Sequence, residues 1–165
     1  MTGMIIRKST YNDIDRLLEI YEEARQFMKV TGNPDQWAGG YPKKSMLLED
    51  IEKANSYVCI MDGMIVSVFY FEIGEDPTYK EIFNGQWLNH KPYGVVHRIA
   101  SARSSKGVGA FCLEWCYDQI GNIRIDTHKD NIPMQNLLIK KGYKRCGIIY
   151  VSDGTQRIAY QKTSK

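Results

Sequence analysis

Two runs of residues, Val95-Val96-His97-Arg98-Ile99-Ala100 and Lys106-Gly107-Val108-Gly109-Ala110, decide how this chain folds. The first run is rich in β-branched residues and predicts a strand. A helix is predicted from Val108 to Gln119, because apolar residues recur there at helical spacing. Its predicted packing face consists of Val108, Phe111, Cys112 and Trp115, with Gln119 in line with them. A strand, a glycine-containing loop and a helix that packs on the sheet therefore follow one another.

The start of this helix has the chemistry of an anion site. The first N–H groups of a helix have no partner within it, and the helix dipole adds partial positive charge there. Gly107 and Gly109 let another group approach the backbone closely, and Arg103 and Lys106 add charge. This combination suits a pyrophosphate, although a plain tight turn before a helix would read the same way. The sequence lacks a P-loop, and Cys112 stands where a Gly-x-Gly-x-x-Gly pattern requires its third glycine.

The rest of the chain alternates between the two periods. Apolar runs bounded by turn residues predict strands at Ile5–Lys8, Tyr57–Met61, Met64–Phe71, Ile123–Asp126, Tyr143–Val151 and Gln156–Gln161. Helical spacing predicts helices from Ile14 to near Gly32, from Ser45 to Ala54 and from Pro133 to Lys141. Asp62-Gly63 and Asp153-Gly154 are typical hairpin turns. We therefore expect a single mixed α/β domain that spans residues 1–165.

Composition excludes several classes of function. The chain has 22 Lys and Arg against 19 Asp and Glu, a net charge of +3, so bulk charge cannot support binding to nucleic acid. No apolar run approaches the roughly 20 residues of a membrane span, and the N-terminus does not resemble a signal peptide. The four cysteines form no Cys-x-x-Cys pair or zinc set, so we expect buried, reduced thiols and a cytoplasmic location.

A second motif follows the predicted strand Ile123–Asp126. Asn131 precedes Pro133, and proline suits the first turn of a helix, so Asn131 is expected to cap one. Gly142 ends that helix, and Tyr143 opens the next strand. The motif therefore predicts a short helix held between two strands.

Together, the two motifs resemble those of the GCN5-related N-acetyltransferases, the GNAT family. Gly107-Val108-Gly109 corresponds to the Gly-x-Gly core of the family's first segment. Asn131, Met134, Leu137 and Gly142-Tyr143 correspond to its Asn-x-x-Ala/Met-x-x-Leu-Tyr-x-x-x-Gly-Phe/Tyr segment. The resemblance implies an α/β (α+β) fold with a twisted, mixed, mostly antiparallel sheet of about seven strands and about four flanking helices. Val95–Ser101 and Ile123–Thr127 would form its splayed parallel pair.

The same resemblance implies an acyltransferase enzyme that uses acetyl-CoA as co-substrate and needs no metal. The pantetheine arm would pair with the backbone of Ile99, Ala100 and Ser101. The pyrophosphate would meet the amides of Ser105, Lys106, Gly107, Val108, Gly109 and Ala110. Asn131 would face the cofactor arm. Lys140 or Lys141 would lie near the nucleotide phosphates, or else at a solvated helix end.

The chain departs from the family pattern at Ser104 and at Leu138, and its loop from the strand to the glycines is shorter than the family norm and has no proline. Ser104 occupies the first motif's Gln/Arg position, and Arg103 stands one residue early. Leu138 occupies the position of the tyrosine that in the family usually protonates the departing thiolate. Leucine cannot donate a proton, so either another group acts as the acid or CoA leaves as a thiolate or takes a proton from water. Tyr143 and Tyr150 are our candidate acids, although each also reads as a packed aromatic.

His97 is our candidate general base, because imidazole has a pKa suited to a base near neutral pH. Strand alternation predicts that His97, Ile99 and Ser101 share one face. A hydrogen-bonded core histidine is the competing interpretation. His128 is a second catalytic candidate, and His90 is expected to be exposed in a loop.

The sequence therefore predicts direct acetyl transfer from acetyl-CoA to a primary amine on a small-molecule or peptide acceptor. Trp37, Tyr41, Trp87 and Tyr93 occupy the two loops expected to cover the acceptor site. We expect no nucleic-acid or membrane partner, and either a monomer or a homodimer. Three alternatives stay open: transfer of a different acyl group or to an oxygen acceptor in the same fold, a CoA-binding regulatory module of the same fold without transferase activity, and a nucleotide-binding module.

Overall fold

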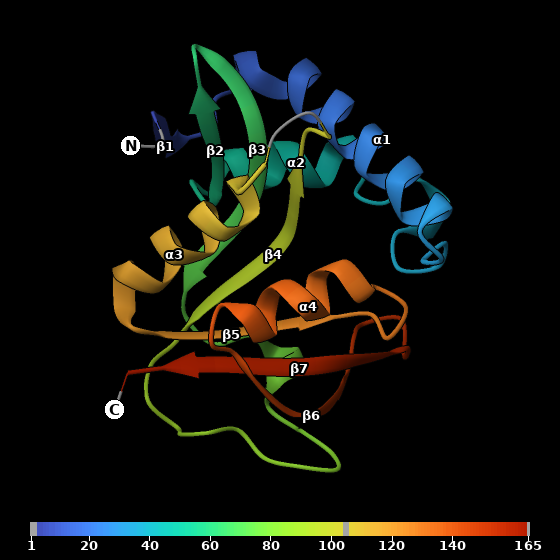
Figure 1. Ribbon diagram of the computed structural model, residues 1–165, viewed down its shortest axis with the longest axis vertical. Helices are drawn as coiled ribbons and strands as arrows, with labels where there is room; N and C mark the ends of the chain where they lie inside the picture. Colours follow the sequence, from blue (N-terminus) through green and yellow to red (C-terminus); the bar gives the residue numbers. More distant parts are fainter. Residues whose placement is uncertain (1–2, 104–105, 165) are drawn as a thin grey trace. The chain divides into compact units, whose positions relative to one another are not determined.

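The structure, a computed structural model, describes residues 3–103 and 106–164. Its strands are β1 (Met4–Lys8), β2 (Ser56–Met61), β3 (Met64–Ile73), β4 (Gly94–Ser101), β5 (Asn122–Thr127), β6 (Lys144–Tyr150) and β7 (Gln156–Thr163) (Figure 1). Its helices are α1 (Ile14–Val30), α2 (Lys44–Glu52), α3 (Val108–Ile120) and α4 (Ile132–Lys140). Short 3₁₀ turns lie at Tyr11–Asp13, Ala38–Gly40 and Pro77–Tyr79. Each predicted strand and helix is confirmed to within about two residues, an ordinary uncertainty of boundaries.

The strands hydrogen-bond in the order β1-β2-β3-β4-β5-β7-β6. β4 and β5 run parallel and pair at Gly94–Ile123 and Val95–Arg124, whereas the other neighbours are antiparallel. The mixed, mostly antiparallel sheet with one parallel pair is therefore confirmed.

The chain forms two compact units, each built from two segments. The first unit contains Met1–Phe71 and His97–Leu113, and the second contains Glu72–Val96 and Glu114–Lys165. The chain passes from one unit to the other inside β3, β4 and α3.

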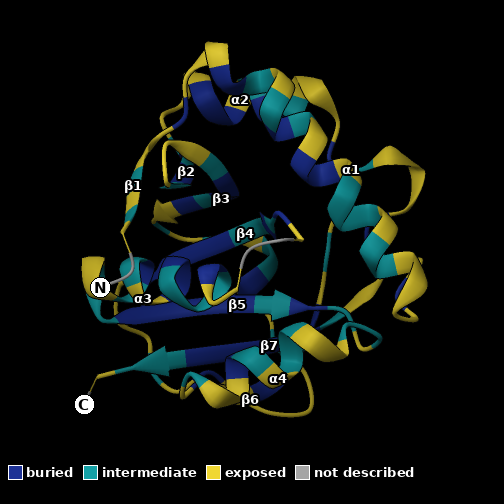
Figure 2. Ribbon diagram, turned by 45° about the horizontal axis from the view of Figure 1, so that its top comes forward, coloured by how far each residue is buried: buried dark blue, intermediate teal, exposed yellow. Residues whose placement is uncertain are grey.

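The first unit has its core between α1, α2 and the strands. The α1 ribbon carries both buried and exposed residues (Figure 2). Leu17, Ile20 and Tyr21 recur on it at helical spacing, and all three are buried. They pack with Leu47, Ile51, Val58, Val68, Trp37 and Ala100. Burying a side chain of this size stabilises a fold by about 1.5–3 kcal/mol, so this apolar face holds α1 in place.

The second unit has an aromatic core built around a buried arginine. The Arg124 guanidinium lies between two rings, 4.3 Å from the Trp87 centroid and 4.1 Å from the Tyr93 centroid. Its Nη2 donates to the Asn89 carbonyl at 2.8 Å. Trp87 and Tyr93 are thus packed around Arg124 within the second unit, and local packing explains both of them better than the predicted lining of an acceptor site.

A buried amide network fastens the loop before β4 to the strands of the second unit. Gln161 of β7 is fully buried, and its Oε1 accepts from the Leu88 N–H at 2.8 Å. Its Nε2 donates to Asn122 Oδ1 at 2.8 Å, and the Asn122 amide donates to the Pro92 carbonyl at 3.0 Å. Because buried polar groups need partners, this network fixes the chain that enters β4.

All four cysteines are buried free thiols, as predicted. The packing face of α3 differs from the prediction, because Cys116 is buried whereas Trp115 is half-buried and Gln119 is exposed. The buried stripe follows Val108, Cys112 and Cys116 at intervals of four residues. Among the described residues, no helix has the length and apolar character needed to cross a membrane.

An ion pair between the exposed Arg7 and the buried Asp13 joins β1 to the turn before α1. Both Arg7 Nη atoms donate to Asp13, at 2.8 and 3.0 Å, and the Thr10 N–H donates to Asp13 Oδ2 at 2.7 Å. The Arg7 guanidinium lowers the pKa of the Asp13 carboxyl below its ordinary 3.8. A carboxyl with a lowered pKa stabilises the fold fully above its unfolded pKa and loses this effect as pH falls through its folded pKa.

Asp13→Asn should therefore lower the free energy of unfolding at pH 7, and the gap to the wild type should narrow below about pH 4. Urea unfolding at pH 7 and at several values below pH 4 measures both effects. Asp15→Asn, at an exposed site on α1, is the control and should change stability little at either pH. If the difference in free energy of unfolding between the wild type and Asp13→Asn stayed constant with pH, the prediction would be contradicted.

Candidate active site

The backbone of β4 divides its hydrogen-bonding groups between two edges. The Ala102 N–H donates to the Val66 carbonyl of β3 at 2.8 Å. The Ala100 carbonyl accepts from Ser67 Oγ at 2.8 Å. Because alternate residues of a strand point their backbone groups to opposite edges, Ile99 and Ser101 direct theirs away from β3. Of the three residues predicted to pair with pantetheine, Ile99 and Ser101 thus present a suitable edge, while the Ala100 carbonyl faces β3.

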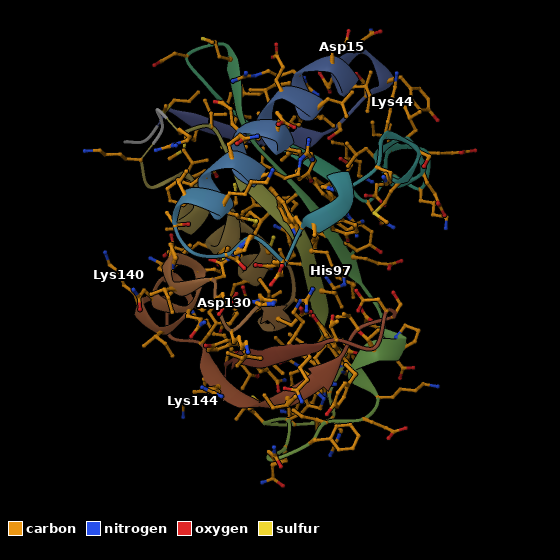
Figure 3. All side chains as sticks on the ribbon, turned by 90° about the vertical axis from the view of Figure 1, so that its right-hand side faces the viewer. Asp15, Lys44, His97, Asp130, Lys140 and Lys144 are labelled. Atoms are coloured by element: carbon orange, nitrogen blue, oxygen red, sulfur yellow. The ribbon has the colours of Figure 1, made fainter. Side chains whose placement is uncertain are left out.

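Arg98 interrupts the regular course of β4. Its φ is +51°, in the left-handed region that L-residues seldom adopt, at a cost of about 1–3 kcal/mol. The His97 ring and the Arg98 guanidinium both lie against Tyr70, at 5.5 and 4.9 Å from its ring centroid. The left-handed residue breaks the strand alternation. The prediction that His97 shares a face with Ile99 and Ser101 is therefore wrong. His97 itself is half-buried on β4 (Figure 3).

Gly107 forms the start of α3. Its φ of +73° is a conformation that suits glycine, and a Cβ there would meet no heavy atom within 4 Å. Its carbonyl accepts from the Phe111 N–H at 3.1 Å, so the helical hydrogen bonds begin here. The amides of Val108, Gly109 and Ala110 consequently have no acceptor four residues earlier within the helix.

Charged residues flank this helix start. Lys106 is exposed, and the Arg103 guanidinium lies 4.9 Å from the Phe27 ring of α1. Ser104 and Ser105 lie outside the described residues, so the predicted role of Ser105 has no structural description. Within the described ranges, no group of three His, Cys, Asp or Glu side chains could hold a metal ion.

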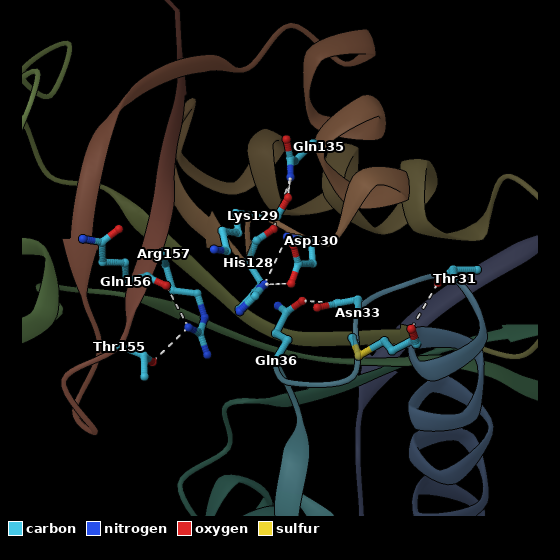
Figure 4. Close-up of polar contacts among 11 residues, drawn as sticks. Thr31, Asn33, Gln36, His128, Lys129, Asp130, Gln135, Thr155, Gln156 and Arg157 are labelled. Atoms are coloured by element: carbon cyan, nitrogen blue, oxygen red, sulfur yellow. Dashed lines mark hydrogen bonds and ion pairs between the residues drawn. The ribbon is translucent and has the colours of Figure 1, made fainter.

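In the second unit, Asn131 caps α4, as predicted. Its Oδ1 accepts from the Met134 N–H at 3.1 Å. The turn before it holds His128, whose Nδ1 accepts from the Asp130 N–H at 3.1 Å (Figure 4). Gln135 Nε2 donates to the carbonyls of His128 and Lys129, at 3.2 and 2.8 Å. His128 is thus part of the turn that sets the start of α4.

The remaining predicted polar residues are distributed over the second unit. His90 is exposed, as expected. Lys140 is exposed at the end of α4 and points away from it (Figure 3), whereas Lys141 Nζ pairs with Glu114 Oε1 at 2.9 Å.

The candidate acids differ in their surroundings. Leu138 is completely buried in α4. Tyr143 is 3% exposed, its hydroxyl finds no hydrogen-bond partner within the described part of the chain, and burial raises its pKa. Tyr150 is 43% exposed, and its hydroxyl accepts from Gln156 Nε2 at 3.0 Å. Their catalytic role stays a prediction.

The sequence analysis missed the residues that surround Arg98. Arg98 Nη2 donates to Asp50 Oδ2 of α2 at 2.7 Å, and Nη1 donates to the Tyr41 hydroxyl at 3.3 Å. The Tyr21 hydroxyl of α1 donates to the Arg98 carbonyl at 2.7 Å. Burial raises the pKa of Asp50, and the Arg98 guanidinium opposes this rise. An arginine inside an apolar strand was the available signal, because a buried cation requires a partner.

Comparisons with known proteins agree with this architecture. No family model and no curated protein sequence matches the chain. Among solved structures, a GNAT-family acetyltransferase from Streptococcus agalactiae is 35% identical, with 99% of this chain and 96% of that chain covered and a TM-score of 0.91. A GNAT-family acetyltransferase from Listeria monocytogenes is 15% identical over 96% of this chain and 94% of that chain, with a TM-score of 0.71.

A ribosomal-protein-alanine N-acetyltransferase from Brucella melitensis is 16% identical over 97% of this chain and 99% of that chain, with a TM-score of 0.62. The second and third similarities show the fold alone. The first combines substantial identity with nearly complete coverage of both chains. This chain therefore belongs to the GNAT family of acetyltransferases and is an N-acetyltransferase enzyme.

Proposed function

We propose that this enzyme transfers an acetyl group from acetyl-CoA directly to a primary amine of a small-molecule or peptide acceptor. The observation that carries the proposal is the geometry of one continuous segment. β4 directs the backbone of Ile99 and Ser101 away from β3, and the chain then enters α3 through Gly107. A strand edge that points away from β3, followed by a helix start whose first N–H groups have no acceptor within the helix, suits an elongated thioester that carries phosphates.

The residues of this segment fit acetyl-CoA in kind. Backbone groups of Ile99 and Ser101 would pair with the amides of pantetheine. The amides from Lys106 to Ala110 would bind the pyrophosphate, and the space beside Gly107 leaves room for it. When bound, acetyl-CoA supplies an acetyl thioester. From the family resemblance, Asn131 would face the cofactor arm in addition to capping α4.

Acetyl transfer requires a free amine, a polarised carbonyl and a thiolate that departs. His97 would accept a proton from the acceptor ammonium, directly or through water. The amine nitrogen would then attack the thioester carbon, while the Ile99 N–H would stabilise the negative charge that develops on the carbonyl oxygen. Once the C–N bond has formed, the nitrogen would release its second proton to water and the C–S bond would break. The thiolate would take a proton from Tyr143, from Tyr150 or from water.

The setting of the reaction follows from the composition. A net charge of +3 offers no bulk attraction for nucleic acid, and the four buried free thiols fit a reducing compartment. We therefore place the enzyme in the cytoplasm, as a monomer or homodimer without a nucleic-acid or membrane partner.

Gly109→Glu tests the cofactor site. The new carboxylate would lie in the first turn of α3 and repel the phosphates, so affinity for acetyl-CoA should fall by about 100-fold or more. Isothermal titration calorimetry measures the affinity. Gln119→Glu, near the other end of the same helix and exposed, is the control and should bind normally. Unchanged affinity in a folded Gly109→Glu protein would refute the site.

His97→Ala tests the proposed base. Turnover should fall by about 100- to 10,000-fold, as is typical for the loss of a general base, while the acetyl-CoA affinity stays within about twofold. A free-thiol assay measures turnover, and the exposed His90→Ala provides the matched control. If His97→Ala turns over normally, His97 has a structural role.

A screen of primary amines with the same assay tests the reaction class. We expect acetyl-CoA consumption that depends on at least one amine and yields equal amounts of free CoA and acetylated product. Binding of acetyl-CoA without turnover across a broad panel of amines and peptides would contradict the proposed acceptor class.

A further inference from the structure

We infer that Arg98 is a positioning residue, which holds the peptide unit between itself and Ile99 in the orientation that acetyl transfer requires. This inference rests on the proposed function, because the Ile99 N–H is the donor proposed to stabilise the carbonyl oxygen. It concerns residues that make no proposed contact with acetyl-CoA or acceptor, namely Asp50, Tyr21 and the Arg98 side chain.

The side chain of Arg98 is held from three directions within the first unit. Asp50 Oδ2 of α2 accepts a hydrogen bond from Arg98 Nη2 at 2.7 Å, and both side chains are only 12% exposed. The hydroxyl of Tyr41 accepts its Nη1 at 3.3 Å. The Tyr70 ring of β3 lies 4.9 Å from its guanidinium carbon. A guanidinium restrained in this way cannot exchange rotamers without leaving Asp50 as a buried, unpaired charge.

The backbone of Arg98 is held separately by α1. The hydroxyl of Tyr21, which is 1% exposed, donates to the Arg98 carbonyl at 2.7 Å. The peptide unit is planar and trans, so the direction of this carbonyl also sets the opposite direction of the Ile99 N–H. One hydrogen bond from Tyr21 thus aims the proposed donor, and the restrained side chain of Arg98 keeps its left-handed φ of +51°.

Stability alone does not explain why Asp50 and Arg98 form an ion pair in the interior. Buried ion pairs contribute little net stability, since desolvation of both charges offsets their attraction. The neighbouring pair on α2, Glu49 with Lys53 at 2.7 Å, is exposed to solvent on both sides. The two adjacent carboxylates therefore offer a matched comparison, with Asp50 directed at β4 and Glu49 at solvent.

The test compares Asp50→Asn and Tyr21→Phe with Glu49→Gln. Asp50→Asn should lower kcat by about 10- to 100-fold, because a small displacement of the donor weakens transition-state stabilisation. Its acetyl-CoA Kd and its acceptor KM should stay within about threefold. Tyr21→Phe should lower kcat by about tenfold with the same pattern. Glu49→Gln should match the wild type in all three quantities.

Amide hydrogen exchange supplies a readout that needs no acceptor. The peptide that covers β4 should exchange faster in Asp50→Asn and Tyr21→Phe, but not in Glu49→Gln. The inference would be overturned if the folded Asp50→Asn and Tyr21→Phe proteins kept the wild-type kcat. It would also be overturned if this peptide exchanged at the wild-type rate in both. If Asp50→Asn does not fold, Tyr21→Phe decides, since it removes one hydroxyl and no charge.

Different results would refute the proposed function and the proposed role of Arg98. Absence of turnover by the wild type with every amine would refute the proposed function, whatever the exchange data show. Normal turnover by the wild type, with an equally high kcat in both variants, would refute only the role of Arg98.

Discussion

The peptide unit between Arg98 and Ile99 is the constraint on which the proposed chemistry depends. Its carbonyl is bonded to Tyr21 of α1, and its N–H therefore points the other way. β4 carries His97 before this peptide unit and continues after it through Ser101 toward the start of α3. A single left-handed residue thus separates the proposed base from the proposed cofactor edge, whereas a regular strand would place His97, Ile99 and Ser101 on one face.

Two buried arginines show how the fold accommodates charge in its interior. Arg98 is neutralised by Asp50, which restrains it in direction as well as in charge. Arg124 instead lies between the faces of Trp87 and Tyr93, where the ring quadrupoles attract a cation. The Arg124 Nη2 also donates to the Asn89 carbonyl at 2.8 Å. Both arginines are therefore held in direction, Arg98 by a carboxylate and Arg124 by a carbonyl and two rings.

The sequence predicted the fold well because its signals are local. The turn pair Asp62-Gly63, the cap Asn131 and the glycine at 107 each require a particular backbone, and each is found in that role. The site was predicted less completely, because the decisive contacts join distant residues. Nothing near Arg98 in the sequence indicates that Asp50 and Tyr21 will meet it, and strand periodicity assumes a regular backbone that Arg98 does not adopt.

Leu138 shows which catalytic requirements matter most when the family's tyrosine is absent. This side chain is completely buried and cannot deliver a proton. A thiol has a pKa of about 8.5, so a thiolate is a far better leaving group than an alkoxide and needs less protonation in the transition state. The harder requirements are then a deprotonated amine and a stabilised oxyanion. In the proposed reaction these fall to His97 and the Ile99 N–H, the two groups on either side of Arg98, so the rigidity of β4 matters more in this chain than the choice of acid.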